Sequence, residues 1–425
     1  MPAGAPVNVR DDAAELDRIL SHGQIRSVFQ PIVELDTGLT VAYEALARGP
    51  ECSPLVDPDR LLAAARQCGR LSELDGTCQD AAMEAALRAG LTGSWRVFVN
   101  VEPQAAQDAL EAPGDVPSAP GGQPSRLCVI AELTERSLTA DPPQLMNLVA
   151  RVRSRGWGVA LDDVGADRNS LALLPLIRPD VVKLDLRVIQ QRPSADIAEI
   201  FSAVNAEAER SGTTVLAEGI ENGDHLNTAR ALGATLGQGW LFGRPGQPQK
   251  SAAPPAASTI RLTRCGPEAS AESPFDLLAA AVPPRLARKD LLIETSKHLE
   301  YQAMRSGEAT AVLATFQDAA FFTPATRRRY RQLAQCAAFV GVLGRGMPLA
   351  PAPGIRGGHL STADPILSDW NIAVIGPHFA SCLAARDLGD SGPDRQRRFE
   401  FVLSHNRELA IKAATALFTR IAREP

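Results

Sequence analysis

The stretch GVALDDVG at residues 158–165 decides how the chain is interpreted, because an apolar run ends there in two adjacent carboxylates and a glycine. Neighbouring carboxylates repel, and each raises the pKa of the other unless a cation lies between them. A turn or a helix N-terminus after a strand also favours Asp, so Asp162 and Asp163 alone fit local structure as well as a binding site. The other short apolar runs of the chain decide between the two interpretations.

Most of those runs also end in a single acid, amide or lysine. The residues are Glu44 after VAY, Asn100 after VFV, Glu132 after VIA, Lys183 after VV, Glu218 after VLA, and Gln238 near Trp240. A turn or a cap accounts for any one of them, but a shared site explains them better together. In a barrel, the carboxyl ends of the strands meet at one rim, where active sites lie.

Strand and helix patterns alternate through the first 245 residues. A tight turn at 36–38 joins expected strands at 27–33 and 40–45, which predicts an antiparallel hairpin. Further strands are expected at 96–101, 127–133, 158–162, 181–184, 214–217 and 236–241, and helices at 12–20, 61–89, 142–154, around 197–204 and at 226–232. This predicts an α/β fold, a modified (β/α)8 TIM-type barrel with one antiparallel strand. The alternative, an open doubly wound sheet, lacks a GxGxxG loop after a strand.

Composition suggests the domain boundaries. Residues 1–11 are expected to be a flexible N-terminus, 12–245 the barrel, and 246–273, rich in Pro, Ala and Ser, a linker. Residues 274–425 are expected to form a smaller α/β sandwich domain. Its helices are expected at 292–304, 326–337 and 406–421, and its strands at 309–316, 338–343, 371–375, 379–384 and 399–403.

Charge and cysteine content exclude several classes of protein. The net charge is −5, which argues against a binder of DNA or RNA polymers or of anionic membranes. We expect no membrane insertion, because no apolar run approaches the length of a span and the N-terminus lacks the pattern of a signal peptide. The seven cysteines are scattered without a CxxC pair, which suits reduced thiols in a cytoplasmic protein.

The side chains at the strand ends indicate a particular chemistry. Carboxylates with an amide favour a hard divalent cation, Mg2+ or Mn2+, over zinc, which prefers Cys and His. So much negative charge in one cleft suggests an anionic substrate bridged by metal, and hydrolysis of a phosphate ester follows as the reaction class. Lys183 would orient the water or offset charge in the transition state.

A series of motifs in the same region resembles a known family. In order they are QPI at 30–32, EALAR at 44–48, FVN at 98–100, ELTE at 132–135, DD at 162–163, KLD at 183–185, EGIE at 218–221 and QGWLF at 238–242. The chain from about residue 20 to 245 is similar to EAL domains, which are phosphodiesterases of cyclic di-GMP. The resemblance implies a barrel with one antiparallel strand and hydrolysis of cyclic di-GMP to linear pGpG.

The resemblance also implies roles for individual residues. Glu44, Asn100, Glu132 and Asp162 would hold one Mg2+ or Mn2+ ion, Asp163 would help to hold a second with Asp162 as a bridge, and Gln238 would complete the metal site. Lys183 and Glu218 would position and deprotonate the water, Glu218 being the family's proposed general base. Arg48 would contact a substrate phosphate, and Gln30 and Leu46 would line the nucleotide pocket. A homodimer is expected by the same resemblance.

The sequence departs from the family pattern in two places. Val164 and residues 166–170 replace the usual Phe and Thr-Gly-Tyr-Ser-Ser after the Asp pair, in a loop that helps to order the second metal and the dimer contact in family members. Glu135, the usual anchor of that loop, is kept. Glu102 stands where a Ser normally follows the metal-binding Asn, either perturbing the site or lying outside it. The alternative function is therefore a catalytically degenerate cyclic di-GMP receptor or a protein-interaction module.

The C-terminal part resembles a DICT domain, a sensory module found beside cyclic di-GMP enzymes, through its position and the stretches at 288–292 and 368–371. It is expected to regulate the barrel, in response to a small molecule or to light through a chromophore that the sequence does not identify. Its scattered His359, His378 and His405 are expected at the surface or hydrogen-bonded in the core. The arginines of 327–331 are expected on a solvated helix face, a phosphate or acidic partner being the alternative.

Overall fold

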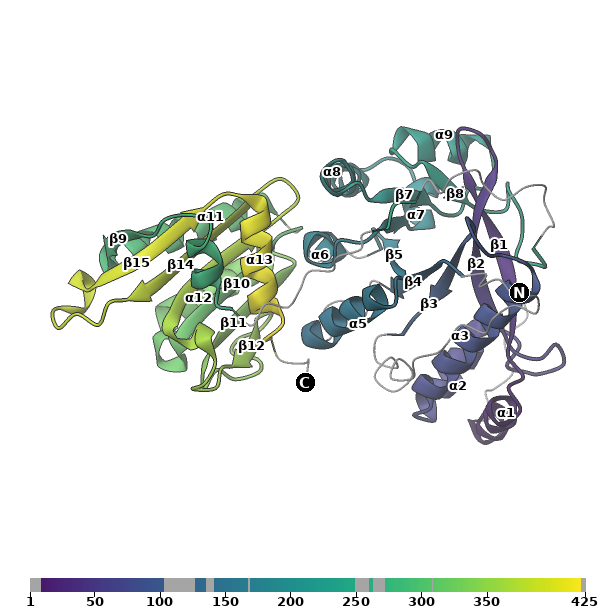
Figure 1. Ribbon diagram of the computed structural model, residues 1–425, viewed down its shortest axis with the longest axis horizontal. Helices are drawn as coiled ribbons and strands as arrows, with labels where there is room; N and C mark the ends of the chain where they lie inside the picture. The colour runs from purple at the N-terminus through teal and green to yellow at the C-terminus, as the bar shows by residue number, and fades with distance from the viewer. Residues whose placement is uncertain are drawn as a thin grey trace.

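The computed structural model describes residues 9–102, 127–134, 141–166, 169–248, 260–262, 272–307 and 309–421. Strands β1–β8 close into a barrel, and a separate seven-stranded sheet forms the second unit (Figure 1). This confirms the predicted TIM-type barrel with a smaller α/β unit. No helix within these ranges is long and apolar enough to cross a membrane.

The barrel begins with the predicted antiparallel hairpin. Strand β1 (Arg26–Glu34) pairs antiparallel with β2 (Thr40–Arg48), and Gln30 lies opposite Glu44. The remaining strands are β3 (Arg96–Asn100), β4 (Val129–Thr134), β5 (Gly158–Val164), β6 (Val181–Leu184), β7 (Thr214–Ala217) and β8 (Leu236–Gln238). From β2 to β8 all neighbours pair in parallel, and β8 closes the barrel against β1 in antiparallel orientation.

The helices and the last strand of the barrel differ from the sequence prediction at four points. The helices are α1 (Val9–Ser21), α2 (Pro58–Gln67), α3 (Leu71–Arg88), α5 (Pro142–Ser154), α6 (Asn169–Ile177), α7 (Leu186–Gln190), α8 (Ala195–Ser211) and α9 (Gly223–Ala231). The helix expected over 61–89 is two helices, because Gly69 has a φ of 66° between them. Helices α6 and α7 were not predicted. The strand expected over 236–241 ends at Gln238, because Gly239 turns the chain with a φ of 156°.

The barrel interior has two levels because side chains alternate along each strand. The lower level is apolar and contains Ile32, Val41, Ala42, Phe98, Ile130, Ala160, Val181, Leu216 and Leu236. Two residues further along β2 to β8, the side chain is polar, as Phe98 is followed by Asn100 and Ile130 by Glu132. In the antiparallel β1 the polar residue, Gln30, precedes Ile32 by two. The sequence pattern at the strand ends therefore becomes one polar level at the carboxyl rim.

Residues 260–262 pack against the lower end of the barrel. Ile260 is 3% exposed and belongs to the apolar cluster inside the barrel, and Leu262 contacts the same cluster. Gly158, the first residue of β5, leaves room for Leu262, since a Cβ atom there would lie 2.7 Å from the Leu262 Cδ2 atom. This part of the Pro- and Ala-rich stretch therefore has a fixed place beneath the barrel.

The second unit is a sheet covered by helices on both faces. Its strands are β9 (Arg285–Arg288), β10 (Ala311–Asp318), β11 (Phe339–Arg345), β12 (Arg356–His359), β13 (Asp369–Ile375), β14 (Ala380–Asp387) and β15 (Arg398–Ser404), in the order β12-β11-β10-β13-β14-β15-β9. Helices α11 (Lys289–Ser306) and α12 (Pro324–Cys336) pack on one face, and α10 (Pro274–Ala279) and α13 (Arg407–Phe418) on the other. The short elements α10, β9 and β12 were not predicted.

Helix α13 lies between this sheet and the barrel, facing α5 and α6 (Figure 1). One continuous apolar core includes residues of α5, α6, α8 and α13, so the two units share buried surface. Polar contacts surround it: Arg178 pairs with Glu408, and Ser202 Oγ lies 3.1 Å from His378 Nε2. The C-terminal unit is therefore docked on the outer helices of the barrel.

Ile260 gives a test of the packing beneath the barrel. We expect Ile260→Ala to lower the free energy of unfolding by about 2–4 kcal/mol, because it leaves a cavity in the apolar cluster. The exposed neighbour provides the control, and Arg261→Ala should change the free energy by less than about 0.5 kcal/mol. Urea unfolding followed by tryptophan fluorescence measures both, and equal stabilities for the two variants would contradict this placement of Ile260.

Candidate functional site

The polar level of the barrel is centred on the ammonium group of Lys183, whose side chain is 1% exposed. Its Nζ atom lies 2.7 Å from Glu132 Oε1, 2.8 Å from Glu218 Oε1, 3.0 Å from Asp162 Oδ1 and 3.7 Å from Glu44 Oε1. These carboxylates come from β2, β4 and β5 and from the residue after β7. The barrel therefore brings together residues that are far apart in the sequence.

Two glutamines extend the hydrogen-bonded network of this group. The Nε2 atom of Gln238 donates to Glu44 Oε2 at 2.5 Å and to Gln30 Oε1 at 3.1 Å. Gln30 in turn donates through Nε2 to the Gly243 carbonyl at 3.2 Å. The antiparallel β1 is thus connected to the centre of the site through Gln238.

Burial and mutual repulsion shift the pKa values of these groups. Burial, reinforced by the Glu44 carboxylate, raises the pKa of Glu132 well above its usual value, although Lys183 opposes the change. Burial likewise raises the pKa of Glu218 to about 8, again against the influence of Lys183. Burial alone would lower the pKa of Lys183, but the surrounding carboxylates raise it well above its usual value. The lysine is therefore the cation of the cluster.

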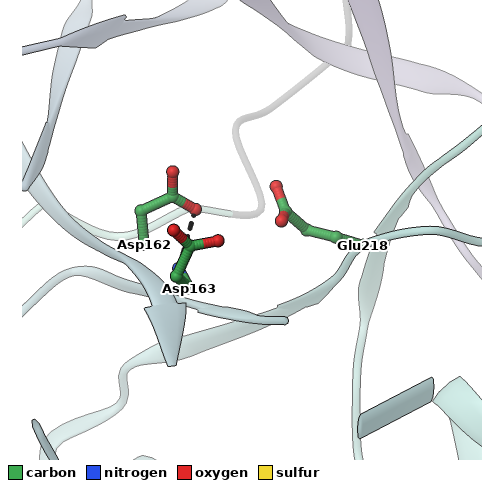
Figure 2. Close-up of side chains that lie close together, drawn as sticks. All are labelled: Asp162, Asp163 and Glu218. Carbon is green, nitrogen blue, oxygen red and sulfur yellow. Dashed lines mark hydrogen bonds between the residues drawn. The ribbon is translucent and has the colours of Figure 1, made fainter. Parts of the chain in front are cut away.

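The open side of the cluster is formed by Asp162, Asp163 and Glu218. Figure 2 shows the carboxylates of Asp162 and Asp163 side by side, with the Glu218 carboxylate opposite them. One oxygen from each lies within 4.8 Å of the others, a spacing at which they could hold a metal ion. Asp163 has a φ of 57°, and its backbone N–H donates to Asp162 Oδ1 at 3.0 Å (Figure 2). A left-handed conformation is unfavourable for a residue other than glycine, and such strain is characteristic of functional sites.

The altered segment after the Asp pair is held by neighbouring helices where the structure describes it. Val164 is fully buried, and Gly165 has a φ of 101°. A Cβ atom on Gly165 would lie 2.8 Å from Val188 of α7 and 3.2 Å from Ile200 of α8, so glycine is required there. Residues 167–168 and the predicted anchor Glu135 lie outside the described residues.

A cavity of about 610 Å3 opens beside this cluster. Leu46, Arg48, Asn100 and Asp163, all predicted site residues, lie in its wall. The Arg48 guanidinium donates through Nη1 to the Ala47 carbonyl at 2.7 Å. The volume of the cavity is within the range of small-molecule binding sites.

Helices α2 and α3 supply further residues of the cavity that the sequence did not indicate as functional. Arg66 of α2 and Asp75 of α3 both lie in its wall. Asp75 is 6% exposed, and burial raises its pKa to about 7. No motif or spacing distinguishes them from other charged helix residues, so only the fold could reveal them.

The charged residues singled out in the C-terminal unit have separate partners. His359 Nδ1 accepts from the Gly346 N–H at 2.9 Å, His378 contacts Ser202, and the His405 ring packs against Phe379. Arg329 pairs with the buried Glu300, and Arg327 lies over the Phe322 ring. The roles of the predicted barrel residues, the homodimer and the cytoplasmic location stay predictions.

Family profiles match both units of the chain. The profile described as "EAL domain" covers residues 13–245. The one described as "Sensory domain in DIguanylate Cyclases and Two-component system", DICT, covers residues 275–388.

Curated relatives match the first of these regions. The chain is 30% identical over 235 residues to the protein named cyclic di-GMP phosphodiesterase NbdA of Pseudomonas aeruginosa, which covers 54% of this chain and 30% of that relative. It is 26% identical over 249 residues to the protein named cyclic di-GMP phosphodiesterase RocR of the same organism, covering 58% of this chain and 63% of the relative. The chain therefore spans less than two thirds of the length of these relatives.

Among solved structures, the Klebsiella pneumoniae BlrP1 complex with manganese and cyclic di-GMP at pH 6 is 28% identical, with a TM-score of 0.46, and the match covers 52% of this chain and 56% of that one. The EAL family profile covers more than half of the present chain. The closed barrel of this chain begins with the antiparallel hairpin β1–β2. The chain therefore belongs to the EAL-domain family.

Proposed function

We propose that the barrel is a divalent-metal-dependent phosphodiesterase that hydrolyses cyclic di-GMP to linear pGpG, and that the C-terminal unit regulates it. The observation that carries this proposal is the set of four carboxylates within 3.7 Å of the Lys183 Nζ atom at the carboxyl rim, beside a cavity lined by Arg48, Asn100 and Asp163. The names of the curated relatives support cyclic di-GMP as the substrate.

The residues at the rim fit Mg2+ or Mn2+. The donors are oxygen atoms, which these hard cations prefer. Both oxygens of the fully buried Glu132 lack a hydrogen-bond donor in good geometry among the described residues, although the Lys183 ammonium lies 2.7 Å away. Buried carboxylates with so few donors are better satisfied by a cation. We propose that Glu44, Asn100, Glu132, Asp162 and Gln238 form one metal site and that Asp162 and Asp163 share a second.

The remaining residues have distinct parts in the proposed reaction. When bound, the divalent metal supplies a water of lowered pKa and positive charge against the phosphate. Glu218 accepts a proton from the attacking water, and Lys183, 2.8 Å from Glu218, orients that carboxylate and offsets negative charge on the phosphate. The water oxygen bonds to phosphorus, one ester bond to the ribose breaks, and the ribose oxygen takes up a proton. Arg48 binds a substrate phosphate, while Gln30 and Leu46 line the nucleotide pocket.

The altered segment after Asp163 favours a second candidate function, that of a receptor. Val164 and Ala166 differ from the usual family loop, which orders the second metal. If that ordering is lost, the barrel binds cyclic di-GMP without hydrolysing it. The enclosed Gly165 supports the enzyme instead, because Val188 and Ile200 hold the backbone next to Asp163 in place.

Regulation by the C-terminal unit is supported by its contacts with α8. Glu207 of α8, 7% exposed, lies 3.5 Å from Arg407 Nη2 at the start of α13, and Arg407 Nη1 donates to the Gly376 carbonyl at 2.8 Å. The same helix contributes Ile200, which encloses Gly165 two residues after Asp163. A displacement of the C-terminal unit would therefore reach the metal-binding strand through α8.

Hydrolysis of cyclic di-GMP by the purified full chain in Mn2+ and in Mg2+, with chromatographic separation of the products, tests the proposed activity. We expect linear pGpG from the wild type. Glu218→Gln should lower turnover by at least about a hundredfold, because it removes the proton acceptor. Exposed Glu221 is a control from the same motif, and Glu221→Gln should retain turnover. Binding of cyclic di-GMP without any product would establish the receptor instead.

The proposed regulatory contact has its own test. Arg407→Met should lower kcat by about three- to tenfold, because it loosens the contact between α13 and α8 and so the support of Gly165. Lys412, exposed on the same helix, gives the matched control Lys412→Met, which should leave kcat unchanged. Equal kcat values for the two variants in folded protein would rule out this route of regulation.

A further inference from the structure

An ion pair between helix α2 and the segment after β3 lies in the wall of the cavity. Arg66, in the last turn of α2, places its Nη2 atom 3.2 Å from Oε1 of Glu102. The Arg66 side chain is 56% exposed and that of Glu102 is 21% exposed, so both retain accessible polar atoms. Both line the cavity that also contains Arg48 and Asn100.

The pair is held from behind by a buried carboxyl group. The backbone N–H of Glu102 donates to Asp75 Oδ1 at 3.2 Å, and Gln79 Nε2 donates to Asp75 Oδ2 at 2.7 Å. Asp75 and Gln79 are 6% and 5% exposed. The backbone position of Glu102 is therefore fixed by α3, while its carboxylate is held by Arg66 of α2. Such preorganisation lowers the cost of binding a ligand.

Apolar residues complete this part of the wall. Leu61, Leu62 and Leu74 line the same cavity, and Leu61 and Leu74 are almost fully buried. An apolar wall with a few fixed polar groups suits a planar ring that must be oriented by its edge. A heterocyclic base of the proposed dinucleotide substrate is such a ring.

The pair presents hydrogen-bonding groups that match one base. The Watson–Crick edge of guanine carries the O6 acceptor next to the N1–H and N2–H donors, and adenine carries a donor followed by an acceptor. Arginine donates to guanine O6, and a carboxylate accepts from neighbouring N–H groups. Side by side, a guanidinium and a carboxylate thus complement guanine and oppose adenine.

We propose that Arg66 and Glu102 are the specificity-determining pair of the barrel, with Arg66 donating to O6 and Glu102 accepting from N1–H and N2–H of one guanine. This deepens the proposed function and rests on it, because it assigns the base contact of the same substrate. It also gives Glu102, which departs from the family pattern, a role outside the metal site. The Glu102 carboxylate pairs with Arg66 on the cavity wall, whereas the carboxylates around Lys183 are those of Glu44, Glu132, Asp162 and Glu218.

Steady-state kinetics with cyclic di-GMP and cyclic di-AMP test the pair in the full chain with Mn2+. For Glu102→Gln and for Arg66→Gln we expect KM for cyclic di-GMP to rise about ten- to a hundredfold, with kcat within about twofold, because the contact is to a base and not to the reacting phosphate. The preference for cyclic di-GMP over cyclic di-AMP should fall by the same factor. A merely structural role would not move this preference.

Arg60, which lies on the same helix as Arg66 and pairs with Asp12 of α1, provides the matched control. Arg60 lies 3.6 Å from Asp12 and does not line the cavity, so Arg60→Gln should leave KM and the preference unchanged. Circular dichroism and thermal unfolding establish that all variants are folded.

The possible outcomes separate this proposal from the proposed function. If the wild type hydrolyses cyclic di-GMP but both variants keep its KM and its preference, the pair proposal fails alone. If the wild type binds cyclic di-GMP without turnover, the enzyme proposal fails. The ratio of the dissociation constants for cyclic di-GMP and cyclic di-AMP, measured by calorimetry in the same variants, then tests the pair. If the wild type neither hydrolyses nor binds cyclic di-GMP, both proposals fail.

Discussion

The position of one buried cation constrains the rest of the barrel. A lysine that is 1% exposed is stable only when paired, and Lys183 has Glu132, Glu218 and Asp162 within 3.0 Å. The carboxylates equally need the lysine, because they would otherwise repel one another in a site of low polarity. The parallel strands β2–β8 and the antiparallel β1 together place all these groups on one level. The apolar level beneath it excludes water, which strengthens each of these interactions.

The same arrangement explains why the C-terminal unit is positioned to affect the site without contacting it. Its contacts are with α5, α6 and α8 on the outside of the barrel, through the apolar core and pairs such as Arg407 with Glu207. Helix α6 follows β5, and α8 encloses Gly165 through Ile200. The strand that carries Asp162 and Asp163 thus has its C-terminal side supported by helices that also hold the second unit.

Much of the fold and of the candidate site follows from local sequence. Short apolar runs that end in one polar residue predicted the barrel strands. The alternation of side chains along a strand then explains why those polar residues share one level of the interior. Helix α6 was missed because it is apolar from Leu171 to its end and contains Pro175, so it shows no amphipathic period. The break at Gly69 and the four-residue strands β9 and β12 depend on tertiary packing rather than on pattern. Arg66 and Asp75 are identified as cavity residues only from the fold, because it places α2 and α3 beside the cavity.

Titration of the metal-free full chain with Mn2+ by calorimetry tests most directly whether the polar level of the barrel is a metal site. We expect the wild type to bind Mn2+, and Asp162→Asn to lose most of that affinity because Asp162 is the proposed bridge between the two sites. Asp196→Asn, an exposed change on α8, should bind as the wild type does. Equal Mn2+ affinity in the wild type and in Asp162→Asn, or no binding by the wild type, would contradict the account.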